Sequence, residues 1–313
     1  MYLQFVSYQI NISASSLFFN QKEKMMNIAI TGATGQLGHL VIESLIKLNS
    51  QHHIIALVRD LKKGFIFKDQ DFEVRHFDYD QPQSLATALK GVDKLLLISA
   101  NEIGRRVAQH KAVIDAAKKA NVPYIAYTSL LNANTSPLGL APEHRETEDL
   151  IKKSGLSYTL LRNNWYSENY LASLQNVIET GILFGAAADG KISSASRQDY
   201  ADAAASVLHG NEHNNKTYEL AGSHAFTLND LAGLISRASS KQIRYQNLTA
   251  EDYRLGLTQA GLVPDLVDVI VDADVQAAQA AMYSERDDLE HIIGRPTTPI
   301  ADSIQHALQA LMI

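Results

Sequence analysis

The chain has 313 residues, enough to bury a large core in one two-lobed domain or in two unequal domains. It contains no cysteine, which excludes a disulfide scaffold, a thiolate metal site and a cysteine nucleophile and fits a reducing compartment. The formal net charge of −6 provides no basic field for nucleic acid, and no apolar run approaches the ~20 residues needed to cross a bilayer. We therefore expect a cytoplasmic globular protein without a metal site that binds neither nucleic acid nor a membrane.

The first residues differ in composition from the rest of the chain. Residues 1–24 mix polar residues with short apolar pairs and lack the positively charged start of a signal peptide. Met25 and Met26 directly precede the first apolar strand. These features predict that residues 1–25 form an extension outside the fold, either poorly ordered or translated from an upstream start codon.

The stretch Asn27–Gly38 combines a short buried strand, a glycine turn and the start of an apolar-periodic helix. In this pattern Gly32 allows the tight turn, Gly35 a close approach of the backbone, and Gly38 the packing of helix against strand. The N-terminus of such a helix offers unpaired N–H groups and a positive dipole end to phosphate. Because no Gly-Lys-Ser/Thr follows, the stretch predicts a dinucleotide site and not an NTPase phosphate loop.

The second strand, Ile54–Val58, ends at Arg59, with Lys62 and Lys63 close behind. An NAD site usually carries an acidic residue here to hold the ribose 2′-hydroxyl, whereas a planar guanidinium suits the 2′-phosphate of NADPH. A solvated basic strand end is the structural alternative, and Asp60 keeps NAD open. The pattern favours NADPH as the cofactor.

Strands and helices alternate through the first half of the chain. Further strands are expected at Glu73–Phe77, Asp93–Ser99, Tyr124–Ser129 and Ser157–Arg162. Helices are expected at Pro82–Leu89, about Arg105–Ala120 and His144–Ser154. This alternation predicts a doubly wound α/β sheet of parallel strands joined by right-handed crossovers.

Three polar segments follow strands and are candidates for the site. The exit Ser99–Glu102 lies where a cofactor would cross the carboxyl edge of the sheet. The loop Leu131–Pro142 is a candidate substrate-side loop or lid. The segment Asn163–Tyr170 carries the only Trp, two Tyr and three amides, which suit a flat pocket that also orients polar groups. The alternative for this segment is an amphipathic helix start with its aromatic residues in the core.

Beyond Leu171 the pattern loosens into short strands at Gly181–Phe184, Tyr218–Leu220 and Gln242–Asn247. Helices begin near Asp199, Thr227 and Thr249, and the last helix follows Pro299 and runs to Leu311. Because no linker separates these elements from the first half, we expect a second, smaller α/β lobe interleaved with the first. We divide the chain into an NADP-binding domain, 26–163, to which some later segments return, and a substrate-binding lobe, 164–313.

Four segments of this sequence resemble those of the NmrA-like atypical short-chain dehydrogenases, from about Met26 to the C-terminus. They are Thr31–Gly38, Tyr127–Leu131, Leu160–Asn163 with Trp165–Tyr170, and Gly294–Thr298. The resemblance is most specific in Trp165–Tyr170 and in the loop Thr135–Leu140.

The resemblance implies a Rossmann lobe that binds NADPH, a small C-terminal substrate lobe, and two-electron reduction of quinones without flavin or metal. By motif position, the family's cofactor contacts carry over to Gly32, Ala33, Thr34, Gly35, Gln36, Leu37, Arg59, Asn101, Glu102, Ile103, Asn163, Asn164, Trp165, Tyr166, Ser167 and Glu168. Asn164 stands where glycine is expected, so its side chain could crowd the nicotinamide side of the site.

The Tyr-x-x-x-Lys dyad of ordinary short-chain dehydrogenases is replaced by His144–Glu148. A ketone reductase has to protonate a strongly basic alkoxide, whereas a reduced quinone is a phenolate-like anion with a pKa of about 10 that water can protonate. The missing dyad therefore fits quinones. We expect Tyr166 and Asn169 to line the quinone pocket as catalytic residues. His144 is either a proton donor or ring-orienting group, or a structural histidine.

The leading hypothesis is thus an oxidoreductase that transfers a hydride from NADPH to a quinone. The alternative from another class is a redox-sensing regulator that binds NADP(H) without turnover, and a reductase or isomerase of other carbonyl compounds is a third. The sequence leaves a homo-oligomer open and does not identify the physiological quinone.

Overall fold

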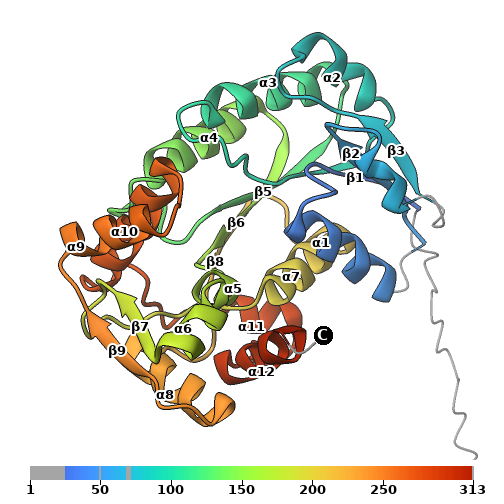
Figure 1. Cartoon of the computed structure of the whole chain (residues 1–313). Coiled ribbons are helices and arrows are strands. Elements are labelled where there is room, and N and C mark those ends of the chain that lie inside the picture. Colours follow the sequence, from blue (N-terminus) through green and yellow to red (C-terminus); the bar gives the residue numbers. More distant parts are fainter. Residues whose placement is uncertain (1–24, 49–50, 68–71, 312–313) are drawn as a thin grey trace, which may run out of the picture.

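The computed structural model describes residues 25–48, 51–67 and 72–311 (Figure 1). The prediction for the N-terminal extension therefore lies, except for Met25, outside the described residues. Within the described ranges, seven parallel strands form one sheet in the order β3-β2-β1-β4-β5-β6-β8. They are β1 (Asn27–Ile30), β2 (His53–Val58), β3 (Glu73–His76), β4 (Lys94–Leu97), β5 (Tyr124–Leu130), β6 (Ser157–Asn163) and β8 (Lys216–Leu220). The order reverses at β1, which confirms the predicted doubly wound sheet and places a crevice at its carboxyl edge.

Two layers of helices cover the two faces of this sheet (Figure 1). One layer contains α1 (Gln36–Lys47), α7 (Arg197–His209) and α11 (Asp288–Ile293), and the other contains α2 (Pro82–Ala88), α3 (Arg106–Lys119) and α4 (Ala141–Ser154). In β2, Ile54 and Ala56 pack under the first layer and Ile55 and Leu57 under the second, so the strand is apolar on both faces. In the described part of the chain, no helix has the length and apolar character needed to span a bilayer.

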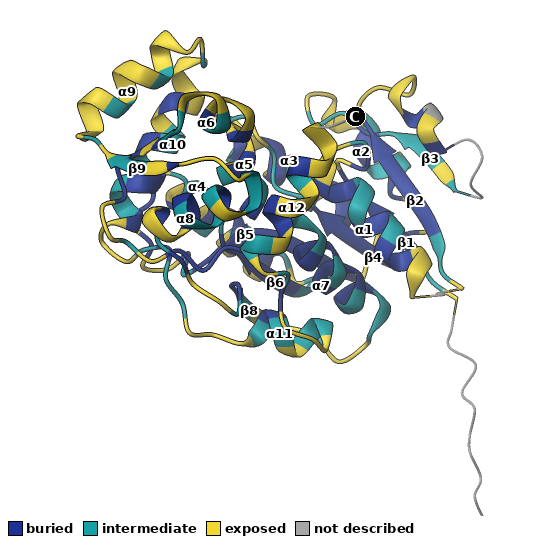
Figure 2. Cartoon of the chain, turned by 60° about the horizontal axis from the view of Figure 1, so that its bottom comes forward, coloured by how far each residue is buried: buried dark blue, intermediate teal, exposed yellow. Residues whose placement is uncertain are grey.

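A second, smaller lobe carries its own apolar core. Its strands β7 (Ile182–Gly185) and β9 (Arg244–Asn247) pair in parallel. Its helices are α6 (Leu174–Thr180), α8 (Leu228–Ser239), α9 (Ala250–Gln259), α10 (Pro264–Ala277) and α12 (Ile300–Leu311), and a short helix α5 (Ser167–Leu171) leads into it. One buried cluster joins Leu183, Leu231, Ile235, Ala273 and Ile304. Helix α9, which has no buried residue, lies exposed at the edge of this lobe (Figure 2).

The two lobes are interleaved, as predicted. Although α7, β8 and α11 follow β7 in the sequence, they pack with the large sheet. Tyr200 of α7, Leu220 of β8 and Leu289 of α11 are buried in the same cluster as residues of β1 and α1. The chain therefore passes back and forth between the lobes.

The start of several helices is set by a capping side chain or by a proline in the first turn. Ser196 and Thr227 form capping boxes with Asp199 and Asp230, and the Thr249 hydroxyl accepts a hydrogen bond from the Asp252 N–H. Helix α4 begins at Ala141 and not at the predicted His144, because Pro142 is tolerated in the first turn, where its missing N–H has no helical partner. The loop after β5 is correspondingly shorter than predicted.

Candidate active site

The turn between β1 and α1 forms an open backbone cradle. Gly32 has a φ of +58°, a left-handed conformation that favours glycine. A Cβ on Gly38 would overlap the Gly32 carbonyl oxygen, so only glycine lets the helix lie this close to the turn. Gly35, which precedes α1, has no side chain to cap the first N–H groups of the helix. These N–H groups are therefore available to an anion such as a pyrophosphate.

The Arg59 guanidinium at the end of β2 is exposed and faces the Glu102 carboxylate. Arg59 Nη1 lies 3.4 Å from Glu102 Oε1, and the Arg59 side chain is 73% exposed. The Asp60 carboxylate instead accepts the Lys62 N–H at 2.8 Å within its own turn. Arg59, the predicted phosphate-binding residue, therefore extends its guanidinium into solvent at this strand end, and Lys62 and Lys63 are exposed behind it.

Buried side chains fix the loop 99–104 that follows β4. His110 Nε2 accepts a hydrogen bond from the Ala100 N–H at 2.9 Å, and Arg106 Nε donates to the Ala100 carbonyl at 2.7 Å. Glu143 of α4 accepts from Arg106 Nη1 at 3.0 Å. Burial, with the positive charge of Arg106 nearby, lowers the pKa of His110 to about 3, so this histidine is neutral and remains an acceptor. The predicted cofactor residues Asn101, Glu102 and Ile103 lie on the fixed loop and are at least partly exposed.

Two neighbouring asparagines after β6 differ in how their side chains are satisfied. Asn164 Nδ2 donates to the carbonyls of Ser193 and Met282 at 2.8 and 3.0 Å. Asn163 is 6% exposed, and its Oδ1 is buried without a hydrogen-bond partner in the part of the chain that the structure describes. Because a buried acceptor without a partner is costly, a donor group of a bound molecule would be stabilised at this point.

Arg197 of α7 brings Tyr166 and Asn169 together. Its guanidinium carbon lies 4.9 Å from the centroid of the Tyr166 ring, and its Nη2 donates to Asn169 Oδ1 at 3.0 Å. Burial raises the pKa of Tyr166, and a hydrogen bond with the Asn163 side chain partly opposes the rise. The two side chains predicted to line the quinone pocket therefore share one cationic partner.

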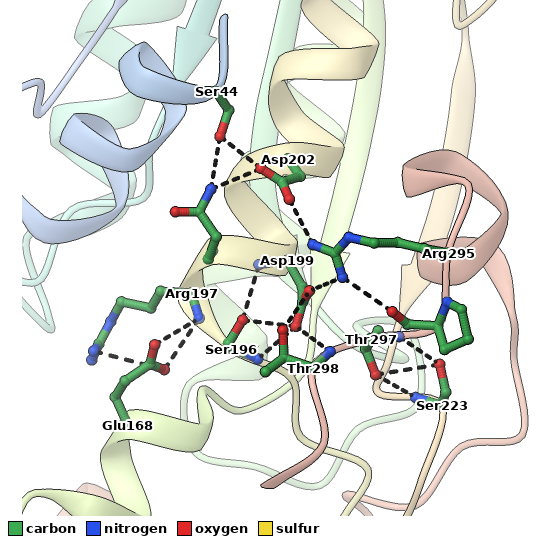
Figure 3. A network of polar contacts seen from close by, with 12 residues as sticks. Ser44, Glu168, Ser196, Arg197, Asp199, Asp202, Ser223, Arg295, Thr297 and Thr298 are labelled. Atoms are coloured by element: carbon green, nitrogen blue, oxygen red, sulfur yellow. Dashed lines mark hydrogen bonds and ion pairs between the residues drawn. The ribbon is translucent and has the colours of Figure 1, made fainter. Parts of the chain in front are cut away.

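Glu168, Ser167 and Trp165 tie the segment after β6 to its surroundings. The Glu168 carboxylate accepts the Arg197 N–H at 3.0 and 3.1 Å and so caps α7 (Figure 3). Ser167 Oγ lies 3.0 Å from Ser194 Oγ, and Trp165 packs against the core of the second lobe. These three predicted cofactor residues use their side chains for contacts within the protein.

The motif Gly294–Thr298 docks onto α7 (Figure 3). Arg295 donates to the Asp199 and Asp202 carboxylates, at 2.7 Å each. Asp202 also accepts from the Ser44 hydroxyl of α1 at 2.7 Å. This network connects the cradle helix, α7 and the segment that leads into α12.

His144 lies in the first turn of α4 and is 5% exposed. Its Nδ1 lies 2.8 Å from the Tyr127 hydroxyl. Burial, with Arg106 nearby, lowers the pKa of His144 to about 3, and burial raises the pKa of Tyr127. Both groups are neutral near pH 7 and are paired with each other, an arrangement that favours the structural alternative for His144.

The position of the dyad lysine is occupied by Glu148, which belongs to a buried ion-pair network. Arg162 Nη2 and Nε donate to its carboxylate at 2.6 and 2.8 Å, and the Ser129 hydroxyl donates at 2.6 Å. Arg162 Nη1 also donates to Glu219 at 2.7 Å. Burial opposes ionisation of Glu148, but the hydrogen bonds from Arg162 and Ser129 outweigh it and lower its pKa. Glu148 is therefore an anion paired with an arginine, whereas the dyad of ordinary short-chain dehydrogenases carries a lysine cation at this position.

The loop after β5 connects this network to the second lobe. The Asn132 N–H donates to Glu219 at 2.7 Å, and Asn134 Oδ1 accepts from Arg162 Nη2 at 2.9 Å. At the other end, the Gly139 N–H donates to Asp272 of α10 at 2.7 Å. The predicted substrate-side loop thus spans the edge of the sheet and the second lobe.

Sequence reasoning missed the partners of the predicted residues. Arg197 gave no local signal, because its contact with Tyr166 depends on the return of α7 to the large sheet. For the ion-pair network the sequence contains only a partial signal, namely that Ser129, Arg162 and Glu219 are polar residues in predicted strands. That these residues face each other in register across β5, β6 and β8 is known from the structure alone.

The sequence model of the NmrA-like family matches residues 24–292. The chain therefore belongs to the NmrA-like family, as the motifs predicted. Among curated proteins it is similar to Quinone oxidoreductase 2 of Escherichia coli (strain K12), with 52% identity over 279 residues, which cover 89% of this chain and 98% of that protein. It is also 26% identical to the NAD(P)H azoreductase of Xenophilus azovorans, over 88% of this chain and 96% of that protein.

Solved structures show the same relationship. The crystal structure of the Escherichia coli NADPH-dependent quinone oxidoreductase complexed with NADPH has a TM-score of 0.87 and 52% identity, covering 90% of this chain and 99% of that chain. The Citrobacter sp. triphenylmethane reductase complexed with NADP(H) has a TM-score of 0.86 and 37% identity, with the same coverage of 90% and 99%. The transcriptional regulator NmrA, at 13% identity and a TM-score of 0.75, shares the fold alone.

Proposed function

We propose that this chain is an NADPH-dependent quinone oxidoreductase that reduces a quinone to a hydroquinone by two-electron transfer. The observation that carries the proposal is the 52% identity to Quinone oxidoreductase 2, which extends over 89% of this chain and 98% of that protein. The regulator hypothesis has no comparable support, because the likeness to NmrA at 13% identity concerns the fold alone.

The residues of this chain fit NADPH. The glycine cradle presents N–H groups at the start of α1 to a pyrophosphate, and a side chain at Gly38 would clash with the Gly32 carbonyl and push the helix away from the turn. Arg59 supplies a planar cation for the 2′-phosphate. Asn163 Oδ1, a buried acceptor without a partner among the described residues, suits the amide donor of a nicotinamide. When bound, the cofactor supplies the hydride, and the protein supplies its orientation.

We further propose that Tyr166 and Asn169 orient the quinone and that no side chain needs to deliver its protons. A hydroquinone anion has a phenol-like pKa of about 10, so water can protonate it. The structure supports this because His144 is buried, neutral and paired with Tyr127 at 2.8 Å. Glu148, as an anion held by Arg162, cannot lower the pKa of a catalytic tyrosine as the dyad lysine does.

We assign residues 26–163 to the cofactor lobe, with α7, β8 and α11 returning to it, and the rest of 164–313 to the substrate lobe. The division is supported by the burial of Tyr200, Leu220 and Leu289 beside β1 and by the separate cluster around β7.

The test is NADPH consumption by purified, flavin-free protein with a simple quinone, followed at the absorbance of the reduced nicotinamide. We expect stoichiometric formation of hydroquinone without added flavin or metal. NADPH binding without turnover on any quinone tested would contradict the enzyme and favour the regulator. Activity that appears only after flavin is added would contradict direct hydride transfer.

A further inference from the structure

One carboxylate lies between two arginines at the predicted adenosine end of the site. Glu102 Oε2 accepts from Arg105 Nη1 at 2.7 Å, and Glu102 Oε1 lies 3.4 Å from Arg59 Nη1. Arg105 Nη2 donates to Asp80 Oδ1 at 2.7 Å. The Arg59 and Arg105 side chains are 73% and 59% exposed, so both guanidiniums are accessible from solvent.

We propose that Arg105 is a second determinant of the choice of NADPH over NADH. Arg59 and Arg105 form one two-arginine site for the 2′-phosphate, and the Glu102 carboxylate occupies that site when no phosphate is bound. The proposal rests on the proposed NADPH-dependent function.

The spacing of the two arginines supports this assignment. Two guanidiniums that bind the two oxygens of one carboxylate are also spaced for two oxygens of one phosphate, since both anions accept bidentate N–H donation from arginine. A phosphate monoester carries up to two negative charges, whereas Glu102 carries one. Ion pairs between exposed side chains contribute little because water screens them, so Arg59 and Arg105 can exchange Glu102 for a phosphate at little cost.

The topology places this cluster at the carboxyl ends of β2, β3 and β4, on either side of the glycine turn. Arg59 follows β2, Asp80 follows β3, and Arg105 precedes α3, whereas the pyrophosphate cradle lies at the start of α1. Because β1 lies between β2 and β4 in the sheet, the contact between Arg59 and Glu102 spans the strand that carries the glycine turn. Asp80 accepts from the second terminal nitrogen of Arg105 and so holds its guanidinium with the other terminal nitrogen on Glu102.

The experiment measures dissociation constants of NADPH and NADH, by nicotinamide fluorescence, for the full chain and four variants, one of which is Arg59→Ala. Arg105→Gln should weaken NADPH binding about tenfold, the effect of losing one charge-assisted hydrogen bond, while NADH binding stays within about twofold. Arg105→Lys keeps the positive charge, so its dissociation constant for NADPH should lie between those of Arg105→Gln and the unmodified chain. The matched control is Arg254→Gln, since Arg254 is 47% exposed and pairs with Asp268 between α9 and α10.

Equal weakening of NADPH and NADH by Arg105→Gln would overturn the proposal, because Arg105 would then serve a part shared by both cofactors. No effect of Arg105→Gln, while Arg59→Ala weakens NADPH, would overturn the two-arginine site and leave the NADPH-dependent enzyme standing. Failure of the unmodified chain to bind NADPH would contradict both the two-arginine site and the proposed NADPH-dependent enzyme.

A fifth variant tests the role of the carboxylate. Glu102→Gln removes the competing anion and should tighten NADPH binding severalfold with NADH unchanged. Weaker binding of NADPH in this variant would contradict the occupation of the phosphate site by Glu102.

Discussion

Arg162 and Glu148 form a buried ion pair, in which Arg162 Nη2 lies 2.6 Å from Glu148 Oε2. The side chain of Arg162 is 6% exposed and that of Glu148 is 1% exposed. The pair joins α4 to β6 directly under the loop after β5. Glu148, at the position predicted for the dyad lysine, holds Ser129 of β5 and Arg162 of β6, and Arg162 in turn holds Asn134 of the loop.

Removing Glu148 should strongly destabilise the fold. In Glu148→Ala the Arg162 guanidinium keeps one carboxylate partner, Glu219, and loses the other in a buried setting, which costs about 3–5 kcal/mol in comparable cases. Urea unfolding followed by circular dichroism measures the change. Asp115→Ala, which breaks the exposed pair with Lys111, is the control and should cost at most about 1 kcal/mol. Equal losses in the two variants would contradict a special role for the buried pair.

Stability should fall on acidification below pH 6.5. His110 and His144 have pKa values lowered from 6.5 to about 3, so the unfolded chain binds protons in this window that the folded chain excludes. Their contribution is fully present above pH 6.5 and decreases as the pH falls toward 3. The slope is at most about 1.4 kcal/mol per pH unit for each histidine. His144→Gln should flatten the dependence of unfolding free energy on pH, and a curve parallel to that of the parent would contradict the burial of a neutral His144.

Arg59→Ala should weaken NADPH binding by about tenfold to a hundredfold, because one charge-assisted contact to phosphate contributes roughly 1.5–3 kcal/mol. NADH binding should barely change, since NADH lacks the 2′-phosphate. Fluorescence titration of both cofactors separates the two outcomes. Equal losses would place Arg59 on the pyrophosphate or the ribose and remove it as a determinant of cofactor choice.

His144→Gln should retain most of its turnover with a reactive quinone. The side chain is buried against Tyr127, and its lowered pKa leaves the ring uncharged near pH 7, so it is not an imidazolium acid there. The measurement is kcat with a saturating quinone, with circular dichroism to confirm folding. A loss above roughly a hundredfold in a folded variant, within the range of general acid catalysis, would make His144 the proton donor after all.

Asn169→Ala should lower kcat/KM for the quinone more than it changes NADPH affinity. The substitution removes the Asn169 oxygen that accepts from Arg197 Nη2 at 3.0 Å and so frees a guanidinium that lies over the Tyr166 ring. We expect roughly a tenfold to hundredfold loss in kcat/KM, because misplaced positioning groups commonly cost this much. Gln175→Ala, which removes an exposed pair with Glu179 on α6, is the control. A larger effect on NADPH binding would move Asn169 to the cofactor site.

The cradle around Gly32 could be predicted from sequence because its strand, turn and helix are adjacent along the chain and each glycine has a local steric reason. The alternation of strands and helices likewise gave the parallel sheet. Helix α10 was missed because acidic residues such as Asp268 and Asp272 interrupt its apolar positions Val267 and Val271.

The partners of the site residues could not be predicted, because they depend on which later elements return to the sheet. Nothing near Arg162 in the sequence indicates that β8 pairs with β6 and brings Glu219 to it. The same holds for Arg197, whose place over Tyr166 follows from the packing of α7 beside α1.

The return of α7, β8 and α11 to the first sheet restricts how the molecule can admit its substrate. The backbone crosses from one lobe to the other after β6, before α7, after β8 and on either side of α11. Two lobes joined by so many backbone crossings cannot swing apart about a single hinge, as domains joined by one or two connections do. Entry of a quinone must therefore rely on small sliding movements and on the loops at the carboxyl edge. For the same reason, neither lobe is a unit that could be cut out and exchanged with that of a relative.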